Sequence, residues 1–130
     1  MRNAVIASLV LGLLAISVAT PRAAVDVAAV TPKRVGLELI VIEAPGCIYC
    51  DAFRRDVLPV FTASERGKDI PVRFVDINDL AEANLSLTAP IEMAPTIVIA
   101  KANAELGRIA GFVGRDTLFQ SIGVVLSTQH

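Results

Sequence analysis

The stretch that decides the fold is GLELIVIEAPGCIYCDAFRRDVLPVF, residues 36–61. Its first eight residues, GLELIVIE, are mostly aliphatic and β-branched, which is typical of a strand covered on both faces. Pro45-Gly46 then marks a turn. Beyond the turn, apolar residues recur at helical spacing at Ile48, Ala52, Phe53, Val57 and Phe61. This pattern predicts a helix that begins at the cysteines and is kinked or ended by Pro59.

Downstream of residue 61 the sequence predicts five more elements. They are a strand over 71–77, a short helix from Asn78-Asp79 to about Leu87, a strand over 96–101, a hairpin partner over 106–110 reached through Asn103-Ala104, and a closing helix over 116–126. The first two strands must be parallel because a helix connects them, whereas the hairpin strands must be antiparallel. The predicted fold is therefore α/β, with a mixed four-stranded sheet flanked by helices.

The composition fits one folded domain. The chain has 130 residues, of which 54% are hydrophobic and 19% charged, too apolar for a disordered chain. Its 12 basic and 13 acidic residues are scattered without a run of one sign, so there is no electrostatic footprint for nucleic acid. We assign residues 36–130 to the domain and expect no nucleic-acid partner.

The N-terminal segment, residues 1–19, is predicted to be a signal peptide. Arg2 precedes an uncharged apolar run over 4–18, and Ser17-Val18-Ala19 offers small residues for cleavage after Ala19. A retained membrane anchor and a buried helix are the alternatives, since the run is near the lower length limit for spanning. Residues 20–35 form a lead-in with an apolar patch at 25–30, to which we assign no function.

The only two cysteines are Cys47 and Cys50, placed at the start of the predicted helix. Unpaired N–H groups and the helix dipole stabilise a thiolate there, so Cys47 is the expected nucleophile and Cys50, one turn deeper, the resolving thiol. A structural disulfide is the alternative, although a bridge closing so short a loop removes little chain entropy. The single histidine, His130, leaves the usual four-ligand zinc set incomplete, and no metal or cofactor is predicted.

Two further features lie close to the cysteines in the predicted topology. In Ala94-Pro95-Thr96, a cis peptide would direct the main chain of Ala94 toward the sulfurs, where an extended client can pair; a trans proline bounding a strand is the alternative. Glu43 is a candidate proton relay for Cys50, or else a solvated strand end. Tyr49 is either a client contact or an ordinary surface residue.

Residues 36–127 resemble the thioredoxin superfamily. The motifs Glu43-Ala44-Pro45-Gly46-Cys47, Arg108-Ile109-Ala110-Gly111-Phe112 and Gly114-Arg115-Asp116 are similar to the SoxS type, small periplasmic thioredoxins of bacterial sulfur-oxidation gene clusters. The resemblance implies a thioredoxin fold, Cys47 as the attacking thiol, Cys50 as the resolving thiol and a cis Pro95. It further implies a periplasmic protein that reduces exported clients, with electrons from a membrane thiol donor. We expect the protein to be a monomer.

Three departures from the superfamily pattern bear on mechanism and partner choice. The Trp-Cys-Gly-Pro-Cys of cytosolic thioredoxins is absent, Val41 stands where those proteins have a buried Asp, and Ala94 precedes the proline where exported reductases often have Thr. Two hypotheses follow. The first is an exported oxidoreductase acting on disulfides or thiol adducts of client proteins; the second is a thioredoxin-fold binding or chaperone-like module with a structural Cys47–Cys50 disulfide.

Overall fold

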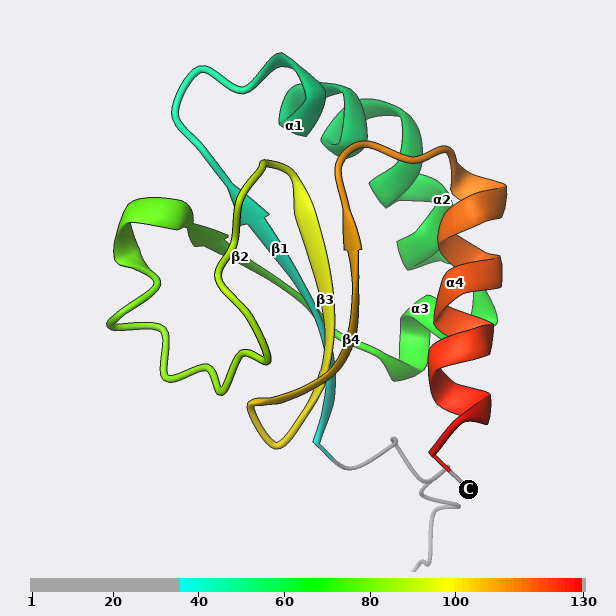
Figure 1. Cartoon of the computed structure of the whole chain (residues 1–130). Coiled ribbons are helices and arrows are strands. Elements are labelled where there is room, and N and C mark those ends of the chain that lie inside the picture. Colours follow the sequence, from blue (N-terminus) through cyan, green and yellow to red (C-terminus); the bar gives the residue numbers. More distant parts are fainter. Residues whose placement is uncertain (1–35, 130) are drawn as a thin grey trace, which may run out of the picture.

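Residues 36–129 are described by the computed structural model shown in Figure 1. The elements along the chain are β1 (Leu37–Glu43), α1 (Ile48–Ala52), the π-helical turn η1 (Phe53–Val57), α2 (Leu58–Ala63), α3 (Glu65–Asp69), β2 (Val72–Asp76), the 3-10 turn η2 (Ile77–Asp79), β3 (Thr96–Lys101), β4 (Ala104–Ala110) and α4 (Arg115–Ser127). Residues 1–35 and 130 lie outside the described residues. The assignments of a signal peptide to residues 1–19 and of a lead-in to residues 20–35 therefore stay predictions.

The four strands form one mixed sheet in the order β2-β1-β3-β4. Strand β1 is parallel to β2, pairing Val41 with Phe74, and antiparallel to β3, pairing Val41 with Ile97. Strands β3 and β4 form the antiparallel hairpin. The predicted topology is confirmed. Strand β3 has the predicted bounds, and every residue of Thr96–Ala100 is buried, as expected for a strand covered on both faces.

One face of the sheet packs against the helices (Figure 1). Successive strand residues point to opposite faces, so alternate β1 and β3 residues meet the helices here. The fully buried side chains of this core include Leu39, Val41, Ile97 and Ile99 from the strands and Phe53, Phe61, Leu118 and Ile122 from the helices. The aliphatic run of residues 36–43 therefore supplies the residues against which the first helix and α4 are docked.

The opposite face is covered by residues 77–95, which lack a regular helix. Strand residues of this second core are Ile40, Ile42, Val75, Val98 and Ala100, and the side chains packed over them are Ile77, Leu80, Ala83, Leu85, Leu87 and Ile91. Apolar side chains thus reach the sheet from an irregular main chain, and this covering segment leads directly into the loop before β3.

The helix predicted from Asn78 to Leu87 is wrong. Only the 3-10 turn Ile77–Asp79 forms, and its N-cap is Asp76, whose carboxylate accepts the Asn78 N–H at 2.8 Å. Asn84 has a left-handed φ of 51°, which stops any helix. Ser86 instead bridges to β4, donating its N–H to the Asn103 carbonyl at 2.9 Å. These long-range main-chain bonds replace the local ones that a helix would make.

The helix after the cysteines does not end at Pro59, because α1, η1 and α2 follow one another from Ile48 to Ala63. A proline lacks the N–H that an α-helix needs, so the carbonyl four residues earlier loses its partner. The chain accommodates this with the π turn η1, in which the Leu58 N–H bonds the Phe53 carbonyl. Phe53, Val57 and Phe61 remain buried as predicted.

Candidate active site at Cys47 and Cys50

The two cysteines lie where β1 passes through a tight turn into α1. Gly46 has φ = +69°, a left-handed conformation that favours glycine and lets the chain turn into the helix. Cys47 is the N-cap of α1, and it forms a disulfide with Cys50 across a Cα–Cα distance of 5.2 Å. Cys47 is partly exposed whereas Cys50 is only 4% exposed, so the pair has an accessible and a shielded sulfur.

The Cys47 sulfur faces the N-terminal end of the helix. Its Sγ accepts the Cys50 N–H at 3.1 Å, and the Cys47 carbonyl accepts the N–H groups of Cys50 and Asp51 at 3.1 and 3.2 Å. An N–H aimed at a sulfur, at the positive end of the helix dipole, favours the charged over the neutral form of that sulfur. The geometry expected for Cys47 is therefore present.

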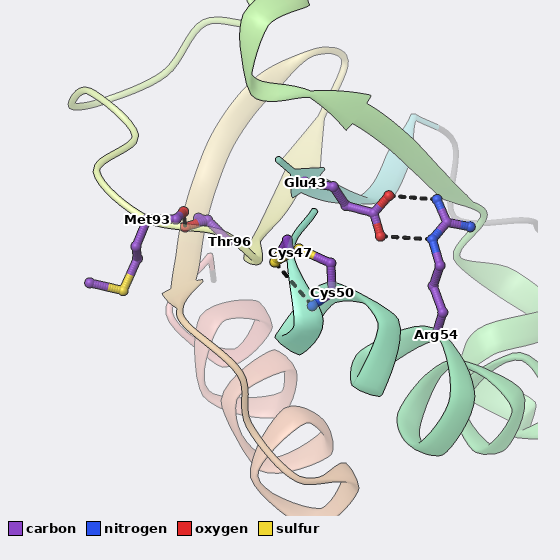
Figure 2. Close-up of a disulfide and its surroundings, with 6 residues drawn as sticks. All are labelled: Glu43, Cys47, Cys50, Arg54, Met93 and Thr96. Atoms are coloured by element: carbon purple, nitrogen blue, oxygen red, sulfur yellow. Dashed lines mark hydrogen bonds and ion pairs between the residues drawn. A yellow bond between two sulfur atoms is a disulfide. The ribbon is translucent and has the colours of Figure 1, made fainter. Parts of the chain in front are cut away.

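The Ala94–Pro95 loop supplies the second part of the site. Its peptide bond is cis, the isomer that the superfamily resemblance implied. Pro95 and Thr96 are buried, and Thr96 Oγ1 donates to the Met93 carbonyl at 2.7 Å. Figure 2 shows Met93 and Thr96 on one side of the disulfide. Among the predicted contact residues, Ala94 and Tyr49 are thus the ones that reach the surface.

The main chain of Ala94 is unpaired within residues 36–129, although the residues around it are held. The Gly111 N–H donates to the Pro95 carbonyl at 2.8 Å, and the Met93 carbonyl accepts from Thr96. Neither the N–H nor the C=O of Ala94 has a protein partner in this range. Main-chain groups normally find a partner, so this pair is open to an incoming strand.

An apolar hollow beside the loop was not anticipated from the sequence. It has a volume of about 370 Å³ and is lined by Tyr49, Met93, Ala94, Gly111 and Phe112. The rings of Tyr49 and Phe112 stack at 6.4 Å between centroids, although the two residues are 58% and 40% exposed. Exposed aromatic and methionine side chains are enriched at interfaces. Of its lining residues, Tyr49 and Ala94 were candidate client contacts and Gly111-Phe112 belonged to a noted motif, whereas Met93 was not singled out.

Glu43, the candidate proton relay, lies on the other side of the disulfide in Figure 2. Both of its carboxylate oxygens accept from Arg54, at 2.8 and 2.6 Å, and the guanidinium of Arg54 lies 3.6 Å from the ring centroid of Phe74. Donation of these hydrogen bonds to the Glu43 carboxylate raises the pKa of Arg54. The carboxylate is turned toward Arg54 rather than the sulfurs, so the relay role stays a prediction.

No family model and no curated protein matches the sequence. The chain is similar in structure to the periplasmic thioredoxin SoxS from Paracoccus pantotrophus in its reduced form, at 26% identity and a TM-score of 0.66, covering 72% of this chain and 99% of that one.

Two thioredoxins are also similar in fold. They are those of Malassezia sympodialis (20% identity, TM-score 0.52, 68% of this chain and 73% of that chain) and Fasciola hepatica (21% identity, TM-score 0.51, 70% and 83%). The fold and the Cys-x-x-Cys pair define a thiol-disulfide oxidoreductase of the thioredoxin type. Its particular resemblance is to SoxS, the subgroup that the motifs around Cys47 and Gly111 predicted.

Proposed function

We propose that this protein is exported and reduces disulfides or thiol adducts on periplasmic client proteins through Cys47 and Cys50. The observation that carries the proposal is the asymmetry of the two sulfurs. Cys47 is partly exposed with an N–H 3.1 Å from its sulfur, whereas Cys50 is shielded behind it. An accessible thiolate beside a shielded partner is the arrangement that captures a client and then releases it.

The reaction begins with the reduced protein. The Cys47 thiolate attacks one sulfur of a client disulfide, so that the client S–S bond breaks, a Cys47–client disulfide forms, and the second client sulfur leaves as a thiolate. Cys50 then loses its proton and attacks the Cys47 sulfur. The Cys47–Cys50 disulfide forms and the first client sulfur is released. Two electrons have passed to the client, and a thiol donor, proposed to be membrane-bound, must reduce the protein again.

Client docking is assigned to Ala94, Pro95, Thr96 and Tyr49. An extended client segment would pair with the free N–H and C=O of Ala94, adding a short strand beside the loop. Buried Pro95 and Thr96 shape that loop, and Tyr49 stands over the adjacent hollow. Because no residue lining the hollow carries a charge, we expect client segments with an apolar side chain next to the reactive cysteine.

Glu43 is retained as the candidate base for the Cys50 proton. This role requires the carboxylate to leave Arg54, since both oxygens are engaged there. Glu43→Gln should then slow the release of a trapped client, and the pH dependence of the release step should change. If the pH profile of Glu43→Gln were unchanged, the ion pair of Glu43 with Arg54 would have a structural role only.

Trapping with Cys50→Ser tests the function. Without the resolving thiol, a client that reacts at Cys47 stays attached by a disulfide that reductant removes. Cys47→Ser is the matched control and should trap nothing. If Cys50→Ser captures no client and Cys47→Ser leaves client reduction intact, the binding-module hypothesis replaces this one. A reduction potential near about −270 mV supports a reductant, and one near about −120 mV an oxidant.

Export rests on the sequence of residues 1–19 and on similarity to a protein described as periplasmic. Among residues 36–129 there is no helix with the length and apolarity to cross a membrane. A fusion of the full chain to a reporter active only outside the cytoplasm should be active, and removing residues 1–19 should abolish that signal. A reporter still active without them would show that another segment directs export.

A further inference from the structure

Arg108 and Glu105, on strand β4, form an ion pair joined by two hydrogen bonds. The guanidinium donates from Nε and Nη2 to the two Glu105 carboxylate oxygens, each at 2.6 Å. The Glu105 side chain is only 2% exposed. Donation from Arg108 holds the pKa of Glu105 below its ordinary value. A carboxylate so shielded from water needs this partner to stay charged.

The pair also holds the covering segment to the sheet. Arg108 donates to the carbonyls of Ala89 and Pro90 at 2.7 and 2.8 Å, and Glu105 accepts the Thr88 N–H at 2.8 Å. Three consecutive residues are therefore bound to one side-chain pair. The planar guanidinium can reach these acceptors at once because its donors are arranged in a rigid fork.

These bonds lie next to the loop that carries the cis peptide. A hollow of about 220 Å³ separates them, and its lining includes Pro90, Met93, Thr96 and Arg108. The carbonyls of residues 89, 90, 93 and 95 are all held by β3, by β4 or by Gly111 after β4. Ala94, whose main chain is free, is thereby placed between fixed points.

We propose that Arg108, with Glu105, is a positioning pair for client binding: it fixes residues 88–90 so that the Ala94 main chain meets an incoming client strand. This inference rests on the proposed function, because it assigns how the same site receives its substrate. The pair touches no reacting sulfur. Its effect is expected on client affinity rather than on the exchange of sulfurs.

A matched control lies at the other end of the same segment. Arg73 donates to Glu38 at 3.0 and 3.1 Å and to the Ala83 carbonyl at 3.2 Å, so it also joins the sheet to the covering segment. Ala83 is eleven residues before Ala94. The Glu38–Arg73 pair therefore resembles the Glu105–Arg108 pair in chemistry but not in distance along the chain from the loop.

The test compares the double variant Glu105→Leu/Arg108→Met with Glu38→Leu/Arg73→Met. Replacing both partners by apolar residues avoids leaving a buried charge unpaired. Two probes are used: a synthetic peptide with a disulfide in an extended segment, and hydroxyethyl disulfide, which has no peptide main chain. We expect the first variant to raise KM for the peptide about tenfold or more, with kcat and the hydroxyethyl disulfide rate within about twofold. The control variant should leave all three within about twofold.

Three results would overturn the proposal: an unchanged peptide KM, an equal rise in both variants, or a parallel fall in the hydroxyethyl disulfide rate. If the first variant does not fold, Arg108→Lys is measured against the same expectation, because one ammonium cannot replace the fork. Amide hydrogen exchange adds a readout without activity. Faster exchange of the Thr88 amide, which donates to Glu105, is expected for the Arg108 variants, and unchanged exchange there would refute the positioning role. A wild-type protein that reduces neither probe would instead refute the proposed function.

Discussion

The two faces of the sheet are covered in different ways. On one face, helices bury large side chains such as Phe53 and Phe61 against alternate strand residues. On the other, residues 77–95 bring apolar side chains to the sheet from an irregular main chain. Carbonyl groups of this main chain accept hydrogen bonds from Arg73 and Arg108. The second covering is therefore held by apolar contacts and, in addition, by a few hydrogen bonds from sheet side chains to its main chain. The loop beside the disulfide belongs to this second covering.

The largest expected effect is on the helical face. Phe61→Ala removes a fully buried ring and should lower the free energy of unfolding by about 3–5 kcal/mol. Leu87→Ala, in the irregular covering, should cost only about 1–2 kcal/mol because Leu87 is partly exposed. Denaturant unfolding of both variants measures the difference, and equal losses would mean that the two faces contribute alike.

A smaller effect is expected at the polar contacts of the second face. Glu105→Gln keeps the shape but weakens charge-assisted bonds, and should cost about 1.5–3 kcal/mol. Glu38→Gln is the control: with a side chain 33% exposed, it should cost less than about 1 kcal/mol. If Glu38→Gln lowered the free energy of unfolding as much as Glu105→Gln, the greater burial of Glu105 would not make its ion pair the stronger one.

The Glu105 contribution should depend on pH. Because Arg108 lowers the pKa of Glu105 from its ordinary 4.5, this stabilisation is fully present above that pH and is lost as pH falls through the lower folded value. The unfolding free energies of wild type and Glu105→Gln should therefore converge as the pH is lowered below 4.5. Urea titrations at pH 6 and at successively lower pH provide the comparison, and a constant gap would contradict it.

Asn84 should show a backbone effect of intermediate size. Its φ of 51° is costly for a β-branched residue, so Asn84→Val should destabilise by about 1–2 kcal/mol, while Asn84→Gly should be nearly neutral. Thermal unfolding distinguishes the two. If valine were tolerated as well as glycine, the left-handed residue would not be what ends the turn after η2.

The smallest effects compare one cap on each side of the sheet. Ser64 caps α3 by accepting the Gly67 N–H at 3.0 Å, and Asp76 caps η2 by accepting the Asn78 N–H. Alanine at either position should cost about 1 kcal/mol. Peptide KM should stay within about twofold in both variants, because both caps are farther from Ala94 along the chain than Ala83 is. A larger rise of KM in either variant would contradict this expectation.

Local sequence patterns were sufficient to predict the strands, the helices that cover one face of the sheet, and the position of the two cysteines at a helix start. Residues 39–42 and 97–100 are apolar on both faces, so their strands are predicted without knowledge of what covers them. The closing helix was predicted at 116–126 and is found at Arg115–Ser127. Cys47 was placed at a helix start by its spacing to Cys50 and by the turn before it.

The conformation of residues 77–95, which cover the second face, could not be predicted because it is determined by contacts with residues far away in the chain. Leu80, Ala83 and Leu87 have the i, i+3, i+7 spacing of a short helix. Ser86 nevertheless pairs with β4, and Arg108 donates to carbonyls 18 and 19 residues before it. The pairing of Glu43 with Arg54 and the hollow at Phe112 are missed for the same reason. Each depends on side chains brought together only by the finished fold.

The position of Tyr49 has a practical consequence. The chain contains no tryptophan and only this tyrosine, and its ring stands on the first helical turn between the two sulfurs in sequence. A disulfide quenches the emission of a nearby phenol ring, so intrinsic fluorescence should report the redox state of the site without any label. Emission should rise when dithiothreitol opens the bridge, which would allow equilibrium redox titrations and stopped-flow traces on the native chain.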